Sequence, residues 1–153
     1  MGSPLFDVLL ALQLFHLLFL VLHDWVPLGR LEAVRAADPV DKRVRITLIG
    51  AVPVALGFAA SLAWVGRTYP MWLLDALAIM YAALLFGELR AWWIPYLVRP
   101  EPLRAARYQA VFGRTHTLFP ARNGIRPNTL HVILHAATLA TVILLAVAII
   151  ARM

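Results

Sequence analysis

The side chains of this sequence that can exchange protons lie inside long apolar stretches. His131 and His135 are four residues apart in one such stretch, so they share a helix face. Glu88 lies in a second stretch and His23 near the end of a third. Histidine and glutamate serve as general acids and bases in many enzymes, and ionisable residues within a membrane span usually face the bundle interior and have a function. We therefore predict catalytic roles for Glu88, His135, His131 and His23.

The same side chains carry donor atoms that bind metals. Imidazole nitrogen and carboxylate oxygen suit Zn²⁺, which makes His131, His135, Glu88 and His16 a possible ligand set. A haem held by two histidines, one from the first apolar stretch and one from the last, is another possibility. The chain has no cysteine, which excludes disulfides and thiolate metal sites. The sequence leaves the cofactor unknown.

A polar segment at residues 113–128 precedes the last apolar stretch. It is punctuated by Pro120, Gly124 and Pro127, which predicts a shaped turn, and Asn128 is suited to cap the helix that follows. Arginine binds anionic groups through paired hydrogen bonds, so we predict that this segment and the polar end of the preceding apolar stretch bind the substrate. The predicted binding residues are Arg90, Trp92, Arg114, His116, Arg122, Asn123 and Arg126.

The composition indicates a membrane protein. Of 153 residues 62% are hydrophobic and only 14% are charged, with a mean hydropathy of +0.79. A soluble domain of this length has about a quarter charged residues, and so much apolar surface exceeds what one small core can bury. The net charge of +6 is then expected to contact anionic lipids. Membrane lipids are the predicted partners, and we expect no nucleic acid to bind.

Four stretches are long enough to cross the bilayer, which takes about 20 residues. They cover about residues 4–26, 45–65, 71–97 and 128–151. We predict an all-α integral membrane four-helix bundle, with residues 1–153 forming a single domain. A short helix is expected near residues 103–111, another within residues 31–39, and an aromatic belt at the membrane surface from Trp92, Trp93 and Tyr96.

The connections between the spans predict the topology. One tight turn, residues 66–70, joins the second and third spans, whereas two longer connections carry most of the 14 Lys and Arg residues. Basic loops stay in the cytoplasm, so both long connections should be cytoplasmic and both termini should face outward. The predicted location is the cell membrane, with several passes.

Depth along each helix links the predicted residues. At about 1.5 Å per residue, His16, Glu88 and His135 lie about 10 to 12 Å from the cytoplasmic ends of three different spans. Such a convergence is typical of a site in a bundle core. The leading hypothesis is a membrane-embedded enzyme acting on a lipidic or isoprenoid-like substrate. The alternatives are a small-molecule or proton-coupled transporter and a structural subunit, and assembly into a homo-oligomer is left open.

Overall fold

The computed structural model describes residues 4–23, 25–31 and 39–152, and its regular secondary structure is helical throughout. Four helical segments are long and apolar enough to cross a membrane, which confirms the predicted all-α membrane fold. They are α1 (Pro4–Leu22), α2 (Val40–Leu62), Met71–Leu97 and α6 (Thr129–Ile150). The third segment consists of α3 (Met71–Glu88), the π-helix η2 (Leu89–Trp93) and α4 (Ile94–Leu97).

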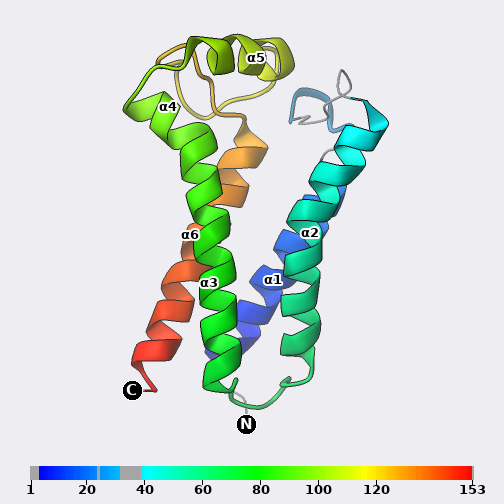
Figure 1. The fold of residues 1–153 in the computed structure, drawn as a ribbon, viewed down its shortest axis with the longest axis vertical. Coiled ribbons are helices and arrows are strands. Elements are labelled where there is room, and N and C mark those ends of the chain that lie inside the picture. Colours follow the sequence, from blue (N-terminus) through cyan, green and yellow to red (C-terminus); the bar gives the residue numbers. More distant parts are fainter. Residues whose placement is uncertain (1–3, 24, 32–38, 153) are drawn as a thin grey trace.

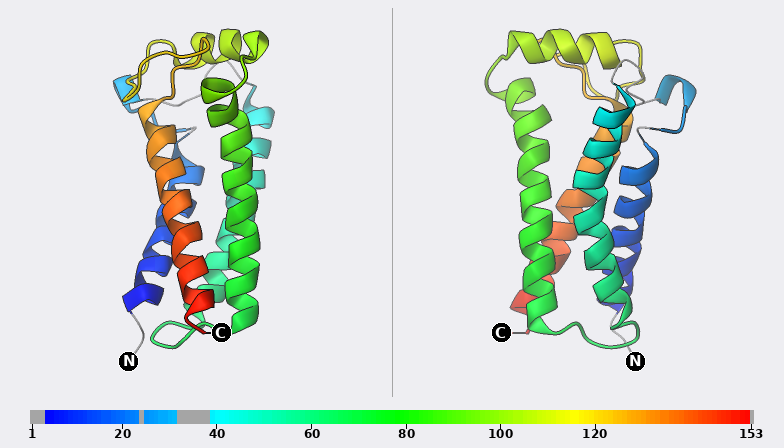
Figure 2. Two further views of the ribbon diagram at one scale, coloured as in Figure 1. Left: turned by 90° about the vertical axis from the view of Figure 1, so that its left-hand side faces the viewer. Right: turned by 45° about the vertical axis from the view of Figure 1, so that its right-hand side comes forward.

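The helices form an upright bundle that opens toward one end (Figures 1 and 2). α1 packs along α2 on one side and α6 on the other, and α6 packs along α3. α2 and α3 touch over a shorter stretch, where a Cβ on Gly57 would lie 2.9 Å from Leu77 Cδ2. Above that contact the two helices diverge (Figure 1). Gly57 therefore permits the close approach of α2 and α3 in the closed part of the bundle.

Apolar side chains fill the closed half of the bundle and also cover its outer faces. The closed half has a core of buried apolar and aromatic side chains from α1, α3, α6 and the turn before α3, including Leu9, Leu74, Tyr81 and Leu145. Large apolar side chains such as Leu56 and Ile79 are exposed on the outer faces. Such faces are stable only against lipid chains, because in water they would leave a large apolar surface uncovered.

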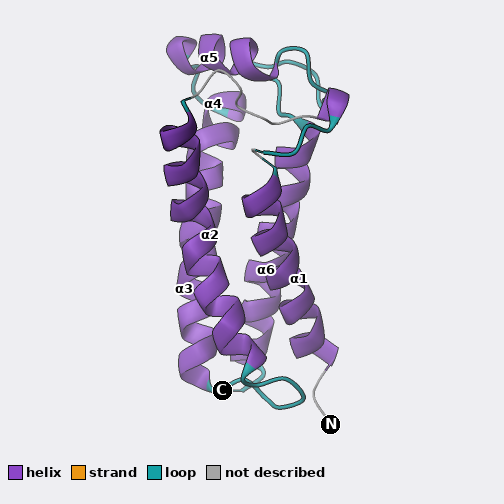
Figure 3. Ribbon diagram, turned by 90° about the vertical axis from the view of Figure 1, so that its right-hand side faces the viewer, coloured by secondary structure: helices purple, strands orange, loops and turns teal. Residues whose placement is uncertain are grey.

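The connections lie where the sequence predicted. The turn between α2 and α3 is at the same end of the bundle as the start of α1 and the end of α6, and both long connections are at the other end (Figures 1 and 3). Helix α5 (Pro102–Phe112) confirms the expected helix near residues 103–111 and lies across that end. The 3₁₀ turn η1 (Gly29–Leu31) follows α1. The helix expected within residues 31–39 falls largely outside the described residues.

The first span is shorter than predicted, because α1 ends at Leu22 and not near residue 26. The second and third spans also differ from prediction. α2 begins at Val40, five residues before the expected start, because Asp41, Lys42 and Arg43 continue the helix past the apolar stretch as a polar first turn. The third span is not one regular helix, since its last third changes to π-helical hydrogen bonding. The departures in the second and third spans place polar side chains at the open end of the bundle.

Candidate functional site

The π-helix η2 shapes the site from the side of the third span. Within it, the Ile94 N–H donates to Leu89 O, a wider turn than that of an α-helix. Pro95 has no N–H to donate to Ala91 O. That carbonyl instead accepts from Arg104 Nη1 at 3.2 Å and Tyr108 Oη at 3.1 Å, both on α5. The widened turn thus fixes α5 across the end of the bundle, consistent with the frequent occurrence of π-turns at functional sites.

Trp92 and Tyr96, two of the three residues predicted to form an aromatic belt at the membrane surface, are buried instead, and Trp93 is half-buried. Trp92 is buried, with its ring 4.3 Å from Tyr108 and 4.6 Å from His131 between centroids. Trp93 donates a hydrogen bond to His135, and Tyr96 is buried and donates to Pro120 O. Helix α5 and the loop after it cover these rings, and a sequence pattern of interfacial aromatics does not reveal such a cover.

Helix α6 supplies the opposite wall. Its first free N–H groups are capped as predicted, because the Asn128 side chain accepts from Leu130 N at 2.9 Å. His131, His135 and Thr138 follow on one face, and all three are buried. Their spacing of four and three residues directs them toward α1 and α3.

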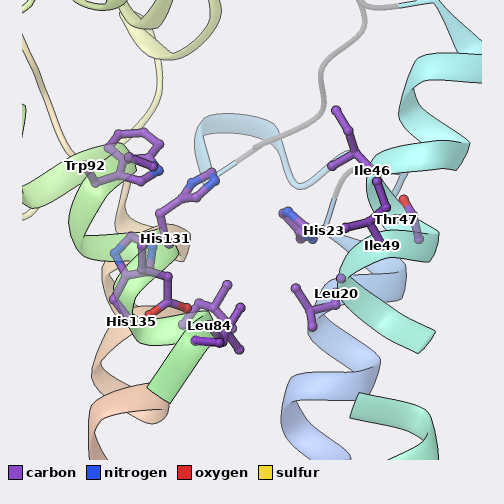
Figure 4. Close-up of a pocket in the computed structure, with 15 residues that line it drawn as sticks. Leu20, His23, Ile46, Thr47, Ile49, Leu84, Trp92, His131 and His135 are labelled. Carbon is purple, nitrogen blue, oxygen red and sulfur yellow. The ribbon is translucent and has the colours of Figure 1, made fainter. Parts of the chain in front are cut away.

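A cavity of about 390 Å³ lies at the open end, between the end of α1 and α2 on one side and α3, η2 and α6 on the other (Figure 4). Its wall is mostly apolar, and its volume falls in the range of small-molecule sites. All four predicted catalytic residues line it, and so does Trp92. The lining residues are Leu20, His23, Ile46, Thr47, Ile49, Gly50, Ala83, Leu84, Gly87, Glu88, Ala91, Trp92, His131, Leu134 and His135.

Glu88 connects the cavity to a buried hydrogen-bond chain. Thr138 Oγ1 donates to Glu88 Oε1 at 2.8 Å and lies 3.1 Å from His16 Nε2. His16 is fully buried beside Tyr81, and its Nδ1 donates to Leu12 O at 2.6 Å. The second oxygen of Glu88, Oε2, is buried without a hydrogen-bond partner among the described residues. Residues from α1, α3 and α6 therefore meet at one depth, as the sequence predicted.

The hydrogen bond to Trp93 determines the proton arrangement of His135. The indole N–H donates to His135 Nδ1 at 3.0 Å, so that nitrogen must be unprotonated. A neutral imidazole then carries its proton on Nε2. His135 is consequently a hydrogen-bond donor in this arrangement and not a base.

His23 and His131 form the upper part of the cavity wall. Their rings are 5.8 Å apart in an edge-on arrangement, and Phe112 of α5 closes over His131 at 5.1 Å. His23 Nδ1 bonds to Phe19 O at 2.9 Å, which fixes that ring against the end of α1. Figure 4 shows His23 facing His131 and Trp92 across the cavity.

The predicted metal ligands are not arranged as a metal centre. Both nitrogens of His16 are engaged, one by Leu12 O and the other by Thr138, which leaves no lone pair for a metal. Within the described parts of the chain, no three His, Asp or Glu side chains are placed to hold one ion. Glu88, His131 and His135 share the cavity wall without converging on one point.

The predicted anion-binding arginines lie apart from the cavity. Arg114, Arg122 and Arg126 are exposed on the loop after α5, and none of them lines the cavity. Arg90 is exposed and pairs with Glu101 at 2.8 Å. Their predicted contact with an anionic group stays a prediction, at the surface of the protein.

Glu101 links this surface to α5. Hydrogen bonds, first from Arg104 and then from Arg90, lower the pKa of the half-buried Glu101 carboxyl. The remaining predicted binding residues hold the loop in shape. Asn123 Nδ2 donates to Tyr96 O at 3.1 Å, and His116 Nδ1 lies 2.8 Å from Thr129 Oγ1.

Two site residues were missing from the sequence prediction. Thr138 lies on the same α6 face as His131 and His135, a spacing that was visible, but a threonine in an apolar helix usually bonds only to its own backbone. Trp93 was assigned to the membrane surface because it follows Trp92 at the end of a span. Only the position of α5 and of the π-turn reveals that both residues belong to the site.

Comparison of this chain with family models, with curated proteins and with solved structures gives no match.

Proposed function

We propose that this protein is a membrane-embedded enzyme acting on a lipidic or isoprenoid-like substrate, which enters the cavity from the bilayer between α2 and α3. The observation that carries the proposal is a single carboxyl in a mostly apolar cavity: Glu88 lines the cavity, is more than nine-tenths buried and has one oxygen without a hydrogen-bond partner among the described residues. A chain of CH₂ and CH₃ groups fits the apolar wall, and a polar group on it would supply the missing partner of Glu88.

The hydrogen bonds assign different roles to Glu88 and His135. Glu88 is the general acid and base, because its Oε2 has no hydrogen-bond partner among the described residues. His135 acts as a donor through Nε2–H, since Trp93 occupies Nδ1. A positioned donor of this kind stabilises negative charge that develops on a substrate oxygen. His131 and His23 are supporting polar groups of the wall, beside the Trp92 ring.

The substrate is expected to come from the cytoplasmic leaflet. The cavity lies at the end of the bundle that carries the two long connections, and most of the basic residues are on those connections. Under the positive-inside rule that end faces the cytoplasm. The exposed arginines after α5 would there attract the phosphates of lipid headgroups.

The test is a comparison of lipids in membranes that contain the protein. We expect mass spectrometry of the lipid extract to show one lipid lost and one related lipid gained with the wild type, but not with Glu88→Gln. Asp75→Asn is the matched control, because Asp75 is an exposed carboxylate on the same helix and does not line the cavity. Identical lipid profiles for the wild type and Glu88→Gln would contradict the proposal.

A second function, proton-coupled or small-molecule transport, is favoured by buried polar groups in the closed half. Ser61 Oγ donates to Gln13 Oε1 at 2.9 Å, and the phenol of Tyr69 is buried in the same half. With His16 they form a discontinuous series of polar side chains through the core. Proteoliposomes with an internal pH indicator distinguish the two functions. A proton-coupled transporter changes the pH of the lumen when a proton gradient or a gradient of its substrate is applied, and an enzyme does not.

A further inference from the structure

We infer that Thr138 transfers a proton between His16 and Glu88, so that His16 acts as the proton store for the cavity carboxyl. The inference deepens the proposed function, since it rests on Glu88 being the acid and base of that site. It is carried by three side chains from three helices that are joined by two hydrogen bonds.

The positions of the protons follow from the partners. Leu12 O can only accept, so His16 Nδ1 carries a proton, and Nε2 is the nitrogen that gains or loses one. Thr138 Oγ1 has one proton and lies within hydrogen-bond distance of His16 Nε2, Glu88 Oε1 and Leu134 O. The Thr138 hydroxyl has one proton and can donate it to only one of these two groups. For both contacts to be hydrogen bonds, His16 or Glu88 must therefore donate a hydrogen bond to Thr138.

Two arrangements with the same number of protons satisfy both contacts. In the first, the His16 imidazolium donates from Nε2 to Thr138, and Thr138 donates to the Glu88 carboxylate. In the second, the Glu88 carboxylic acid donates from Oε1 to Thr138, and Thr138 donates to neutral His16. To pass from the first to the second, the N–H bond at Nε2 breaks as a new O–H bond forms on Thr138. The original Thr138 O–H bond breaks as an O–H bond forms at Glu88 Oε1. No proton enters or leaves.

A tyrosine and three histidines surround this pair of residues. Tyr81 of α3 contacts the His16 ring at 5.0 Å between centroids, and His131 and His135 of α6 line the cavity with Glu88. From the end of α1 the cavity receives His23, and from α2 it receives only uncharged side chains. Among the described residues lining the cavity, Glu88 has the one carboxyl, and none is Lys or Arg.

This geometry gives the two oxygens of Glu88 separate tasks. Glu88 lines the cavity and its Oε2 has no hydrogen-bond partner among the described residues, whereas Oε1 is connected to His16 through Thr138. The His16 imidazolium passes its proton through Thr138 to Glu88, and Glu88 gives that proton to the bound molecule, which leaves His16 neutral and Glu88 a carboxylate. A proton taken from the bound molecule returns to His16 by the reverse path. An apolar cavity can then support acid and base chemistry without admitting water.

The test uses the protein in bicelles with no substrate. Nitrogen-15 NMR of labelled histidine follows His16 Nε2, and infrared difference spectroscopy follows the protonated carboxyl band of Glu88. We expect Glu88→Gln to shift the His16 Nε2 signal and His16→Gln to shift the carboxyl band. Thr138→Val should abolish both effects, and Thr138→Ser should restore them.

A control variant and two outcomes decide the inference. Thr141→Val should keep the coupling, because the Thr141 hydroxyl donates only to Ala137 O of its own helix. A His16 signal that is indifferent to Glu88→Gln would overturn the inference, as would coupling that survives in Thr138→Val. If Thr138→Val does not fold, the Glu88→Gln measurement in the wild-type threonine background still decides. The NMR and infrared measurements contain no substrate, so their outcome is independent of the lipid assay. The proton coupling can be absent while lipid conversion is observed, and it can be present while lipid conversion is not.

Discussion

Replacing Thr138 with valine should destabilise the bundle more than the same change one turn further along α6. Valine has nearly the shape of threonine but no hydroxyl. At position 138 the change removes the partner of His16 Nε2 and of Glu88 Oε1, both in the bundle interior. At position 141 it removes only a bond to the backbone of the same helix.

The structure sets the size of the difference. Thr138 and Thr141 are both fully buried, and each hydroxyl lies within hydrogen-bond distance of the carbonyl four residues before it, so that this contact is common to both positions. What remains are two hydrogen bonds between helices. Such bonds within a membrane contribute about 0.6 kcal/mol on average and up to about 1.7 kcal/mol each. Thr138→Val should therefore lower the free energy of unfolding by about 1 to 3 kcal/mol more than Thr141→Val.

Equilibrium unfolding in mixed micelles, with SDS as the denaturant and helix content as the signal, measures this difference. Thr138→Ser, which keeps the hydroxyl, should recover most of the lost stability. Equal destabilisation by Thr138→Val and Thr141→Val would refute the reasoning, because the contacts to His16 and Glu88 would then contribute nothing.

Three further predictions concern the parts that surround the cavity. Gly57→Ala places a methyl group 2.9 Å from Leu77 Cδ2 and should cost about 1 to 3 kcal/mol in the same unfolding assay, as overpacking does. Trp93→Phe removes the donor to His135 Nδ1, so nitrogen-15 NMR should change from the single Nε2–H form to a mixture of both neutral forms. The pKa of Glu101 is lowered by its hydrogen bonds from Arg104 and Arg90. The stability that these bonds give to α5 is therefore present above the ordinary value of 4.5 and is lost as the pH falls through the lowered pKa. Amide exchange in α5 should speed up as the pH falls through that lowered pKa.

Each of these predictions has a matched comparison. Gly50→Ala, whose methyl group would lie 3.6 Å from Leu20 Cδ2, should be tolerated, and equal costs at both glycines would refute the packing argument. For His135, spectra unchanged by Trp93→Phe would show that the indole does not select its form. For α5, the faster amide exchange at low pH should be absent in Glu101→Gln. If the faster exchange persists in that variant, a group other than Glu101 causes it.

The fold was predictable because its strongest signals are local. Apolar stretches of sufficient length predict spans, and the distribution of basic residues predicts that both long connections share one end. The cap at Asn128 was also visible, because capping depends on residues adjacent in sequence. The starting point of α2 was missed, since charged residues can extend a helix beyond the membrane.

The site was predictable only in part. The meeting of Glu88 with His16 followed from comparing depths along straight helices, but the threonine between them did not. The general acid and base role predicted for His135 did not specify which nitrogen carries the proton, and the hydrogen bond from Trp93, which lies in a π-turn, places that proton on Nε2. A π-turn depends on how Pro95 and α5 are accommodated together, which involves residues distant in sequence.

The central claim is that Glu88 is a carboxyl buried in an apolar cavity that opens to the bilayer. Dicyclohexylcarbodiimide, an apolar reagent that attacks protonated carboxyl groups from within the membrane, tests this directly when the modified peptide is located by mass spectrometry. We predict modification at Glu88 and none at the exposed Asp75, with the reverse preference for a water-soluble carbodiimide. An unmodified Glu88, or equal modification of both residues by the apolar reagent, would contradict the account.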